Sequence, residues 1–543
     1  MMRLISLFIL TILVMSATAL ADTTWVAGGS AVSGQWSDVG SPYIIQGDIH
    51  IAPFDTLKVG PDVLVFFDRL GRFTVEGVLL VSGTPGAEVC FTADTLANTL
   101  SWGGIRLISP TGVSQFAHAI IQYGHALASG EFGFGGGIYC NGANIVMNNC
   151  TVRWCRATSG QGIYLSNHST ATLAECTIRE NGSPDGLGGG FYLRNGCTAT
   201  LADCYVSRNQ ALYGGGMSVD ASTVTLTRCH ISKNNAVVSG GGLFCSTASV
   251  VNASNCLFLA NSSMGGGAMD GRFEVNLLMD HCLIESNIAM RQGGEGPGGG
   301  LAFAGGHQRV TNCTFVNNAA GQGGAVWAGA NTVLENCIFA FQVAGGGVRF
   351  PYAGSTLQFC CFANNEDGDI TGTLGPIGVG GVAYTNANGD SCDRYQNLFL
   401  NPRFDGSATQ AYHLAAGSPC INSGSPVTAH DPDGTIADMG AYYYDGLRAD
   451  EPVTLHPSSF ALSSYPNPFN PSTSLHYDLA HSGPVSLRIF DLMGRQVAVL
   501  ENGPRLAGSY TVTWDASSQP SGSYFAVLES AGLHRTQKLL LLK

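Results

Sequence analysis

A twelve-residue phrase recurs along the chain and constrains the fold more than any other feature. It reads VTLTRCHISKNN at 224–235, and close variants begin at residues 171, 199, 251 and 308. In each copy a cysteine is followed by an apolar residue two positions later and by an asparagine three positions beyond that. These cysteines recur every 23 to 31 residues, at Cys150, Cys176, Cys204, Cys229, Cys256, Cys282, Cys313, Cys337 and Cys360. A repeat of this length predicts a solenoid, in which each unit buries its apolar face against its neighbours.

The apolar residues within one repeat alternate in short runs, which is the pattern of β-strands. In the repeat around residue 224 the alternating pairs are Met217 with Val219, Val224 with Leu226, and Cys229 with Ile231. The odd step between successive pairs requires a corner, because an unbroken strand would turn the second pair outward. One repeat therefore supplies three short strands, and stacked repeats predict a parallel β-helix.

Equivalent side chains of stacked coils lie above one another, so the repeated residues predict columns. Asparagine suits one corner because it tolerates left-handed backbone and can bond the amides above and below. It recurs at Asn181, Asn209, Asn234, Asn261, Asn287, Asn318 and Asn365. Glycine triplets such as 188–190, 214–216 and 240–242 mark the next corner, where positive φ or close backbone approach is needed. We interpret the asparagine column as structural.

Composition and charge agree with this architecture. A chain of 543 residues exceeds one compact core, and 73 glycines with only 12% charged residues fit many turns and short strands better than helices. The net charge is −13, and no cluster of Lys and Arg is present. Phosphate binding needs such a cluster, so we expect no nucleic-acid partner.

The N-terminus has the pattern of a secretory signal peptide. Arg3 precedes an apolar run from Leu4 to Met15, and Ala19 and Ala21 provide a small-residue cleavage site. The run is shorter than the ~20 residues that span a bilayer, which favours cleavage over a retained anchor. We expect the signal peptide to be residues 1–21 and the mature chain to contain no transmembrane segment.

The 17 cysteines leave the redox state open. Disulfides persist outside the cell, and an odd number leaves at least one thiol unpaired. Stacked cysteines point the same way down a ladder and rarely reach disulfide torsions, so buried thiols are the preferred interpretation. A few disulfides remain an alternative, among them a lone bridge between Cys150 and Cys155. A metal site is disfavoured because no Cys-x-x-Cys pair is present.

Residues 22–445 resemble secreted right-handed parallel β-helix proteins of the pectin-lyase-like fold. The resemblance is carried by SPYIIQGDIHIAPFDTLKVGPDVLVFF near the N-terminus, by WGGIRL at 102–107, and by the closing segment YHLAAGSPCINSGSP with DPDGTIADMGAYYYD. Right-handedness follows from this resemblance and from the general preference of parallel crossovers.

A linker at 446–459 separates this region from a second domain at 460–543. VSLRIFDLMGRQVAVL, GSYTVTWDAS and GSYFAVLES are alternating strands, enough for a small β-sandwich. YPNPFNPST, FDLMGRQV, SGSYF and TQKLLLLK resemble the immunoglobulin-like C-terminal sorting domain of type IX secretion. The expected fold class is therefore all-β, a right-handed parallel β-helix solenoid followed by an immunoglobulin-like β-sandwich. The resemblance implies the type IX machinery as partner and a secreted or cell-surface location.

Candidate chemistry is sparse. The densest acidic group on successive coils is Asp270, Glu274, Asp280 and Glu285 with Arg272, and charged outer faces are the simpler explanation. Asp431, Asp433 and Asp438 have a spacing that could hold Ca²⁺, although a structural turn is preferred. We assign no catalytic, cofactor-binding or metal-binding residue, and we expect no cofactor apart from this Ca²⁺ alternative.

Three functions remain compatible with the sequence. The preferred one is a non-enzymatic, adhesin-like surface scaffold that binds a polysaccharide or cell-surface glycan. The alternative is an enzyme, and the family resemblance then implies a polysaccharide lyase or glycoside hydrolase. The third is a purely structural coat or an accessory to a larger assembly. Two enlarged corners, 181–190 and 287–300, are candidate binding loops, because insertions in a solenoid map to one side.

Overall fold

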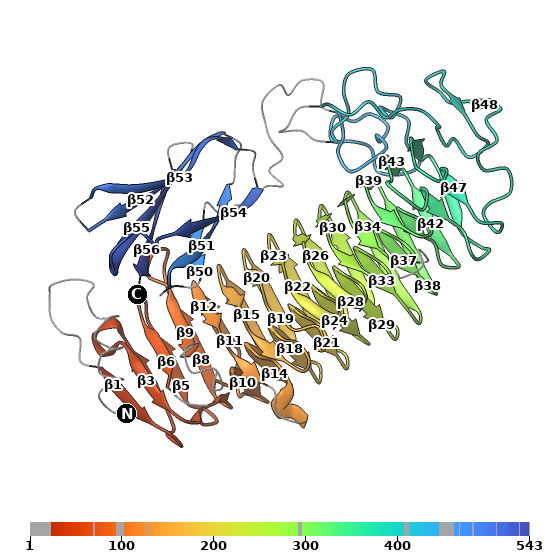
Figure 1. Cartoon of the computed structure of the whole chain (residues 1–543). Coiled ribbons are helices and arrows are strands. Elements are labelled where there is room, and N and C mark those ends of the chain that lie inside the picture. The colour runs from red at the N-terminus through yellow and green to blue at the C-terminus, as the bar shows by residue number, and fades with distance from the viewer. Residues whose placement is uncertain are drawn as a thin grey trace. The chain divides into compact units, whose positions relative to one another are not determined.

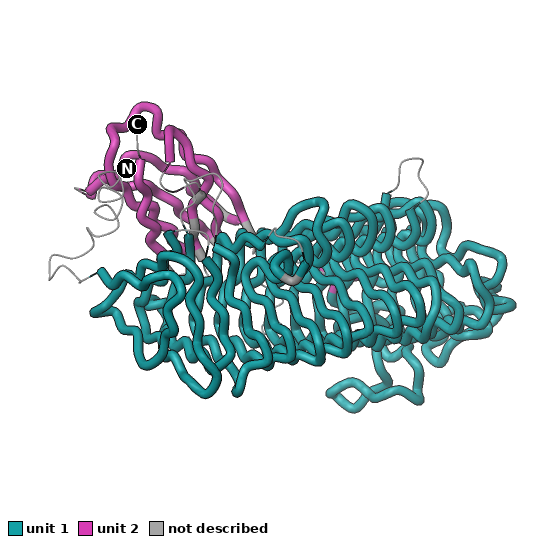
Figure 2. The backbone as a smooth tube through the Cα atoms, turned by 90° about the horizontal axis from the view of Figure 1, so that it is seen from below, with its two compact units in different colours: residues 1–403, 413–444 teal, residues 404–412, 445–543 magenta. Residues whose placement is uncertain are grey.

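The computed structural model describes residues 23–541, apart from 69–70, 94–101, 127–129, 291–295, 407–411, 445–460 and short gaps at 466, 468, 480–482, 493, 506–507 and 531–532. The signal peptide at 1–21, the linker at 446–459 and the boundaries beside that linker lie outside the described residues. The chain divides into two compact units, one of residues 1–403 and 413–444 and one of residues 404–412 and 445–543 (Figure 2).

The first unit is a right-handed parallel β-solenoid of about 12 turns, which confirms the predicted fold (Figure 1). Sheet A has 14 strands, from β1 (Thr24–Ala27) to β46 (Cys361–Ala363). Sheet B has 13 strands, from β4 (Ile49–Ile51) to β47 (Ile370–Thr371), and sheet C has 13, from β2 (Gly34–Trp36) to β45 (Thr356–Gln358). Neighbouring strands of each sheet come from successive coils, so every ladder runs along the solenoid axis.

One coil shows how the sequence sets the corners. β25 (Met217–Asp220) lies in sheet B, β26 (Thr223–Thr227) in sheet C and β27 (His230–Ser232) in sheet A. The corners fall between these strands, where the apolar alternation changes parity, as predicted. The sequence did not predict a fourth, five-stranded ladder at the corner between sheets A and B, with strand order β24 (Gln210–Tyr213), β28 (Asn235–Ser239), β32 (Ser262–Ser263), β36 (Ile288–Ala289) and β40 (Ala319–Ala320).

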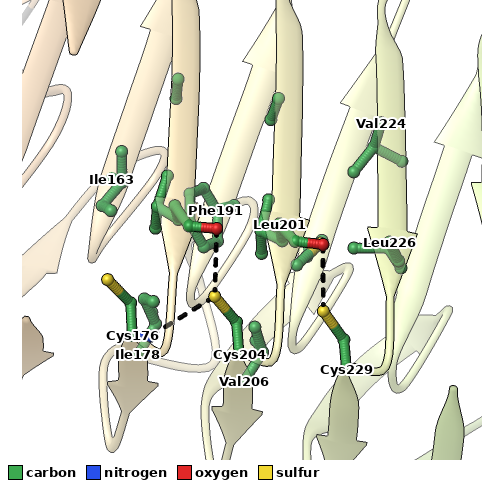
Figure 3. Close-up of a cluster of buried hydrophobic side chains, with 14 of the residues drawn as sticks. Ile163, Cys176, Ile178, Phe191, Leu201, Cys204, Val206, Val224, Leu226 and Cys229 are labelled. Atoms are coloured by element: carbon green, nitrogen blue, oxygen red, sulfur yellow. Dashed lines mark hydrogen bonds between the residues drawn. The ribbon is translucent and has the colours of Figure 1, made fainter. Parts of the chain in front are cut away.

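The cysteine column lies inside the solenoid, at the corner between sheets C and A (Figure 3). The backbone N–H of Cys176 donates to Sγ of Cys204 at 3.4 Å, and the Cys204 thiol donates to the carbonyl oxygen of Leu173 at 3.6 Å. All 17 cysteines fall within the described residues, and all are free thiols in the structure. In the column, sulfurs such as that of Cys204 therefore bridge successive coils by hydrogen bonds.

The asparagine column is also inside, and its bonds run from amide to amide as predicted. Oδ1 of Asn234 accepts both the backbone N–H and the Nδ2 group of Asn209, at 3.0 and 3.1 Å. Cys155 heads this column, because its N–H donates to Oδ1 of Asn181 at 3.0 Å, and Cys150 belongs to the cysteine column. The suggested Cys150–Cys155 bridge is absent from the structure, where each cysteine begins a different column.

The explanation of asparagine by left-handed backbone was wrong. The positive φ belongs to the residue before each asparagine, as in Glu180 (57°), Arg208 (54°) and Lys233 (55°). The residue before each column cysteine behaves likewise, as in Glu175 (52°) and Arg228 (50°). Asparagine is selected instead because its amide satisfies buried backbone groups at the corner.

The glycine triplets meet two separate requirements. The first glycine of a triplet has positive φ, as in Gly214 (64°) and Gly240 (67°). The second has little room for a side chain: a Cβ on Gly241 would lie 2.5 Å from the carbonyl oxygen of Gly267 and 2.6 Å from backbone atoms of Ser262. Adjacent coils therefore approach so closely at Gly241 that a side chain does not fit there.

We expect Gly241→Ala to destabilise the solenoid by about 1–3 kcal/mol, because the clash is with backbone that cannot rotate away. Gly305→Ala is the matched control within the solenoid, since the nearest atom to a Cβ there is the backbone nitrogen of Glu274 at 3.9 Å. Thermal unfolding followed by circular dichroism compares the two variants. Equal melting temperatures would contradict this explanation of the triplets.

The second unit is a small antiparallel β-sandwich, as predicted. One sheet has the order β50 (Ala461–Tyr465), β51 (Ser472–Leu479) and β54 (Gly508–Asp515). The other has the order β53 (Gln496–Arg505), β52 (Gly483–Asp491), β55 (Gly522–Ser530) and β56 (Leu533–Leu541). Its own buried core includes Leu475, Leu487, Ile489, Trp514 and Leu539. Within the described part of the chain, no helix has the length and apolar character needed to cross a membrane.

Candidate functional site

The predicted acidic group is spread over different faces of the solenoid. Asp270 lies on β33 (Met269–Gly271) of sheet B, and Glu274 lies in the following turn. Asp280 ends β34 (Val275–Asp280) of sheet C, and Glu285 ends β35 (Leu283–Glu285) of sheet A. Within this group, Asp270 and Arg272 form an ion pair. The four carboxylates therefore do not gather at one place, because successive sequence positions turn through the corners.

Asp270, Arg272, Ser239 and Phe244 form what we call the Asp270 cluster. The Arg272 guanidinium donates through Nη2 to Oδ2 of Asp270 at 3.1 Å and to Oγ of Ser239 at 2.8 Å. Ser239 also donates to Asp270. The centre of the guanidinium lies 5.9 Å from the centroid of the Phe244 ring. Ser239 lies 31 residues before Asp270, and only the coil stacking brings the two together, so no local motif could reveal the pair.

The cluster combines a buried anion with an accessible cation. The Asp270 side chain is 5% exposed, whereas that of Arg272 is 41% exposed. Burial raises the pKa of Asp270, and the neighbouring Arg272 and the Ser239 hydroxyl oppose that shift. Asp270 therefore holds Arg272 in place, and the remaining guanidinium N–H groups face solvent as hydrogen-bond donors.

A column of mostly aromatic residues on the outer face of sheet B leads to the cluster. The β-pairing aligns Tyr139, Tyr164, Tyr192, Ser218 and Phe244 on successive strands, followed by Asp270. The three tyrosines are buried and pack with Phe134 and Leu187, so they are structural. Phe244 is half-buried and contacts the Tyr213 ring at a centroid distance of 5.0 Å. The accessible aromatic surface of this column therefore lies beside Arg272.

The arrangement offers the contacts of a binding site. The side chain of Asp270 contacts Ser239 and Arg272. A fixed guanidinium beside an aromatic ring offers donors to hydroxyl or carboxylate oxygens and an apolar face for stacking.

The three aspartates of the closing segment are engaged in a turn. Asp433 Oδ1 accepts the Thr435 N–H at 2.9 Å, and Asp431 Oδ2 accepts the Asp438 N–H at 2.8 Å. Asp438 accepts the N–H groups of Asn422 at 2.7 Å and Tyr444 at 2.5 Å. Across the described residues, no group of three His, Cys, Asp or Glu side chains is placed to hold a metal ion. These hydrogen bonds are those of a structural turn.

Asp438 makes the closing segment sensitive to pH. Burial raises the pKa of Asp438 to about 6, above its usual value. The hydrogen bonds from the backbone N–H groups of Asn422 and Tyr444 lower this pKa but do not cancel the effect of burial. The folded state therefore binds this proton more tightly than the unfolded state does. We expect the stabilising contribution to be complete below about pH 4 and lost as pH rises through about 6. Unfolding of wild type and Asp438→Asn between pH 4 and 7 tests this, since equal pH profiles would contradict it.

The enlarged corner at 181–190 is anchored by a side chain of the preceding coil. Nε2 of Gln161 donates to the carbonyl oxygens of Ser183 at 3.2 Å and Gln210 at 3.1 Å. Gln161 is fully buried and occupies the middle position of a glycine triplet, so its side chain fills the extra space. The second enlarged corner includes residues 291–295, which lie outside the described residues. The idea that both corners bracket one ligand stays a prediction.

Comparison with known proteins agrees with this architecture. Residues 136–306 match the family model described as the right handed beta helix region. This part of the chain therefore matches the family in which the solenoid fold is found. Residues 463–542 match the model of the secretion system C-terminal sorting domain. The protein carries a type IX sorting domain and is secreted or displayed on the cell surface.

One curated relative shares a limited stretch with this chain. Metabotropic glutamate receptor-like protein R of Dictyostelium discoideum is 25% identical over 179 residues. The match covers 28% of this chain and 11% of that protein. The similarity therefore concerns a small fraction of the relative's length and gives no information about activity.

Proposed function

We propose that the exported β-helix is a non-enzymatic scaffold that binds an extracellular glycan at the Asp270 cluster. The observation that carries the proposal is the half-exposed Arg272, fixed by Asp270 and Ser239 beside the Phe244 ring. Arginine in this setting is pre-organised, so it loses little side-chain entropy when it binds oxygen atoms of a ligand. A sugar presents both such oxygens and an apolar ring face.

The sorting domain supports an extracellular ligand, because it directs the chain to the cell surface or beyond. The dispersal of the four carboxylates over three sheets and a turn supports binding without catalysis. The rigid coil stacking also suits an adhesin-like role, since it holds Ser239, Phe244 and Asp270 on strands and Arg272 directly after β33.

Glycan arrays carrying cell-wall and plant polysaccharides test the proposal, followed by calorimetry on the glycans that bind. We expect Arg272→Ala and Phe244→Ala each to weaken binding about tenfold or more, because both remove central contacts. Arg228→Ala is the control, since Arg228 is an exposed arginine paired with Asp203 at another corner. Unchanged affinity in both cluster variants, with melting temperatures preserved, would place binding elsewhere.

A further inference from the structure

The segment 413–444 turns back along the solenoid and covers part of the outer face of sheet A. The Ala441 N–H donates to Oγ1 of Thr314 at 2.9 Å, and the Gly440 N–H donates to the carbonyl oxygen of Asn336 at 2.7 Å. A Cβ on Gly440 would lie 2.7 Å from Cδ1 of Ile338. The outward residues Thr314 and Ile338 are therefore buried beneath this closing segment.

Two cysteines lie at this contact, one on each side. Cys361 begins β46 and pairs with Ile338 of β43 (Ile338–Ala340), so it continues the outward column beneath the closing segment. Cys420 belongs to the closing segment, and its carbonyl oxygen accepts the Met439 N–H at 3.0 Å. Residue 439 immediately precedes Gly440, which sits over Ile338. The backbone contacts thus bring Cys420 to the place where Cys361 faces outward.

The side chains complete this approach. The thiols of Cys420 and Cys361 lie within hydrogen-bonding reach of each other, and both residues are fully buried. The Cys361 thiol also donates to the carbonyl oxygen of Leu400 at 3.1 Å.

This pair differs from the cysteine column in its geometry. Column cysteines such as Cys337 and Cys360 project in the same direction from parallel strands, which disfavours the disulfide torsion. Cys361 and Cys420 come from two layers that face each other, so their side chains approach from opposite sides. Both are free thiols in the structure.

We propose that Cys361 and Cys420 form a disulfide during export, which fastens the closing segment to the last coils of sheet A. The oxidant is a disulfide-bearing thiol-exchange protein of the oxidising compartment through which the chain passes. One cysteine thiolate attacks the oxidant's disulfide, which gives a mixed disulfide and releases one thiolate of the oxidant. The second cysteine then attacks the mixed disulfide. The chain's two thiols become a disulfide with loss of two protons, and the oxidant's disulfide becomes a dithiol.

Burial sets the order of events. Burial and the neighbouring Cys361 raise the pKa of the Cys420 thiol well above its usual range, so little thiolate exists once the segment has docked. Exchange therefore takes place while the closing segment still opens and closes over the sheet. The column cysteines are enclosed earlier, as each coil stacks on its predecessor.

The test uses full-length protein collected from the cell surface or medium, unfolded in denaturant with an alkylating reagent and no reductant. Intact mass is expected to show all but two of the 17 cysteines labelled, and all 17 after prior reduction. Peptide mapping is expected to recover a fragment that joins Cys361 to Cys420. Labelling of all 17 cysteines without reductant, or a linkage between other positions, would overturn the proposal.

Two variants separate this pair from oxidation elsewhere. Cys420→Ala is expected to leave every remaining cysteine labelled without reductant. Cys392→Ala is the matched control, since Cys392 is also buried in this part of the chain but contacts Gln396. It is expected to leave two cysteines unlabelled. Two unlabelled cysteines in Cys420→Ala would mean that another pair is oxidised and would contradict the assignment.

Discussion

Removal of residues 461–543 is expected to abolish surface display and to leave a folded β-helix in the periplasm. The physical reason is that each unit has its own buried core and the two cores share no residue. The solenoid therefore keeps its packing when the sandwich is removed, while the sorting domain that directs export is lost. Cell fractionation with immunodetection locates the truncated chain, and protease resistance reports whether it is folded.

A point variant gives the same test with the full chain length. Leu487 is fully buried in the sandwich, so Leu487→Asp places a charge in that core and unfolds the second unit alone. It should reproduce the loss of display. The control is Leu492→Asp, because Leu492 is 69% exposed. If the truncated chain and the wild type reached the surface equally, the second unit would not be the sorting signal.

Asn234→Leu is expected to destabilise the solenoid by about 4 kcal/mol, although the two side chains have similar size. Oδ1 of Asn234 accepts two donors from Asn209, and its Nδ2 group donates to the carbonyl oxygen of Val206 at 2.8 Å. Leucine leaves these groups buried without partners, at a cost of about 1–3 kcal/mol each, partly offset by apolar burial.

The neighbouring asparagine provides a control of the same chemistry. Asn235 is exposed, and its Oδ1 accepts the Ser262 hydroxyl at 2.9 Å. Asn235→Leu should change stability by about 0.5 kcal/mol or less. Urea denaturation followed by circular dichroism measures both variants in the full-length protein. Similar midpoints for the two variants would mean that the column contributes little.

The repeat made most of the solenoid predictable. Changes of parity between Val219 and Val224, and between Leu226 and Cys229, fall at corners because side-chain direction alternates strictly along a strand. The inward cysteines and asparagines followed from the same argument. The cause of the asparagine preference did not, because sequence alone does not tell which of two adjacent residues at a corner takes the positive φ.

The candidate site was not predictable to the same degree. Asp270 was singled out with three acids that are near it in sequence, yet its partner Ser239 lies on an earlier coil. The closing segment shows the same limit, since Ala441 bonds Thr314 across 127 residues. Such contacts depend on how a non-repetitive segment folds back over the sheet, and they leave no periodic signal.

The columns also give the solenoid a direction. The backbone N–H donors of the cysteine column point to the coil that follows in sequence, as the N–H of Cys176 donates to Sγ of Cys204. The last one, the Cys360 N–H, is received at 3.0 Å by Oδ1 of Asn397, which Asp393 holds in place. Each coil thus accepts the column N–H of the coil before it, whereas Asn397 accepts the N–H of the last column cysteine. When the chain emerges N-terminus first, the column hydrogen bonds of each coil are completed only after the next coil has formed. The column ends at Asn397, where an amide oxygen replaces sulfur as the acceptor.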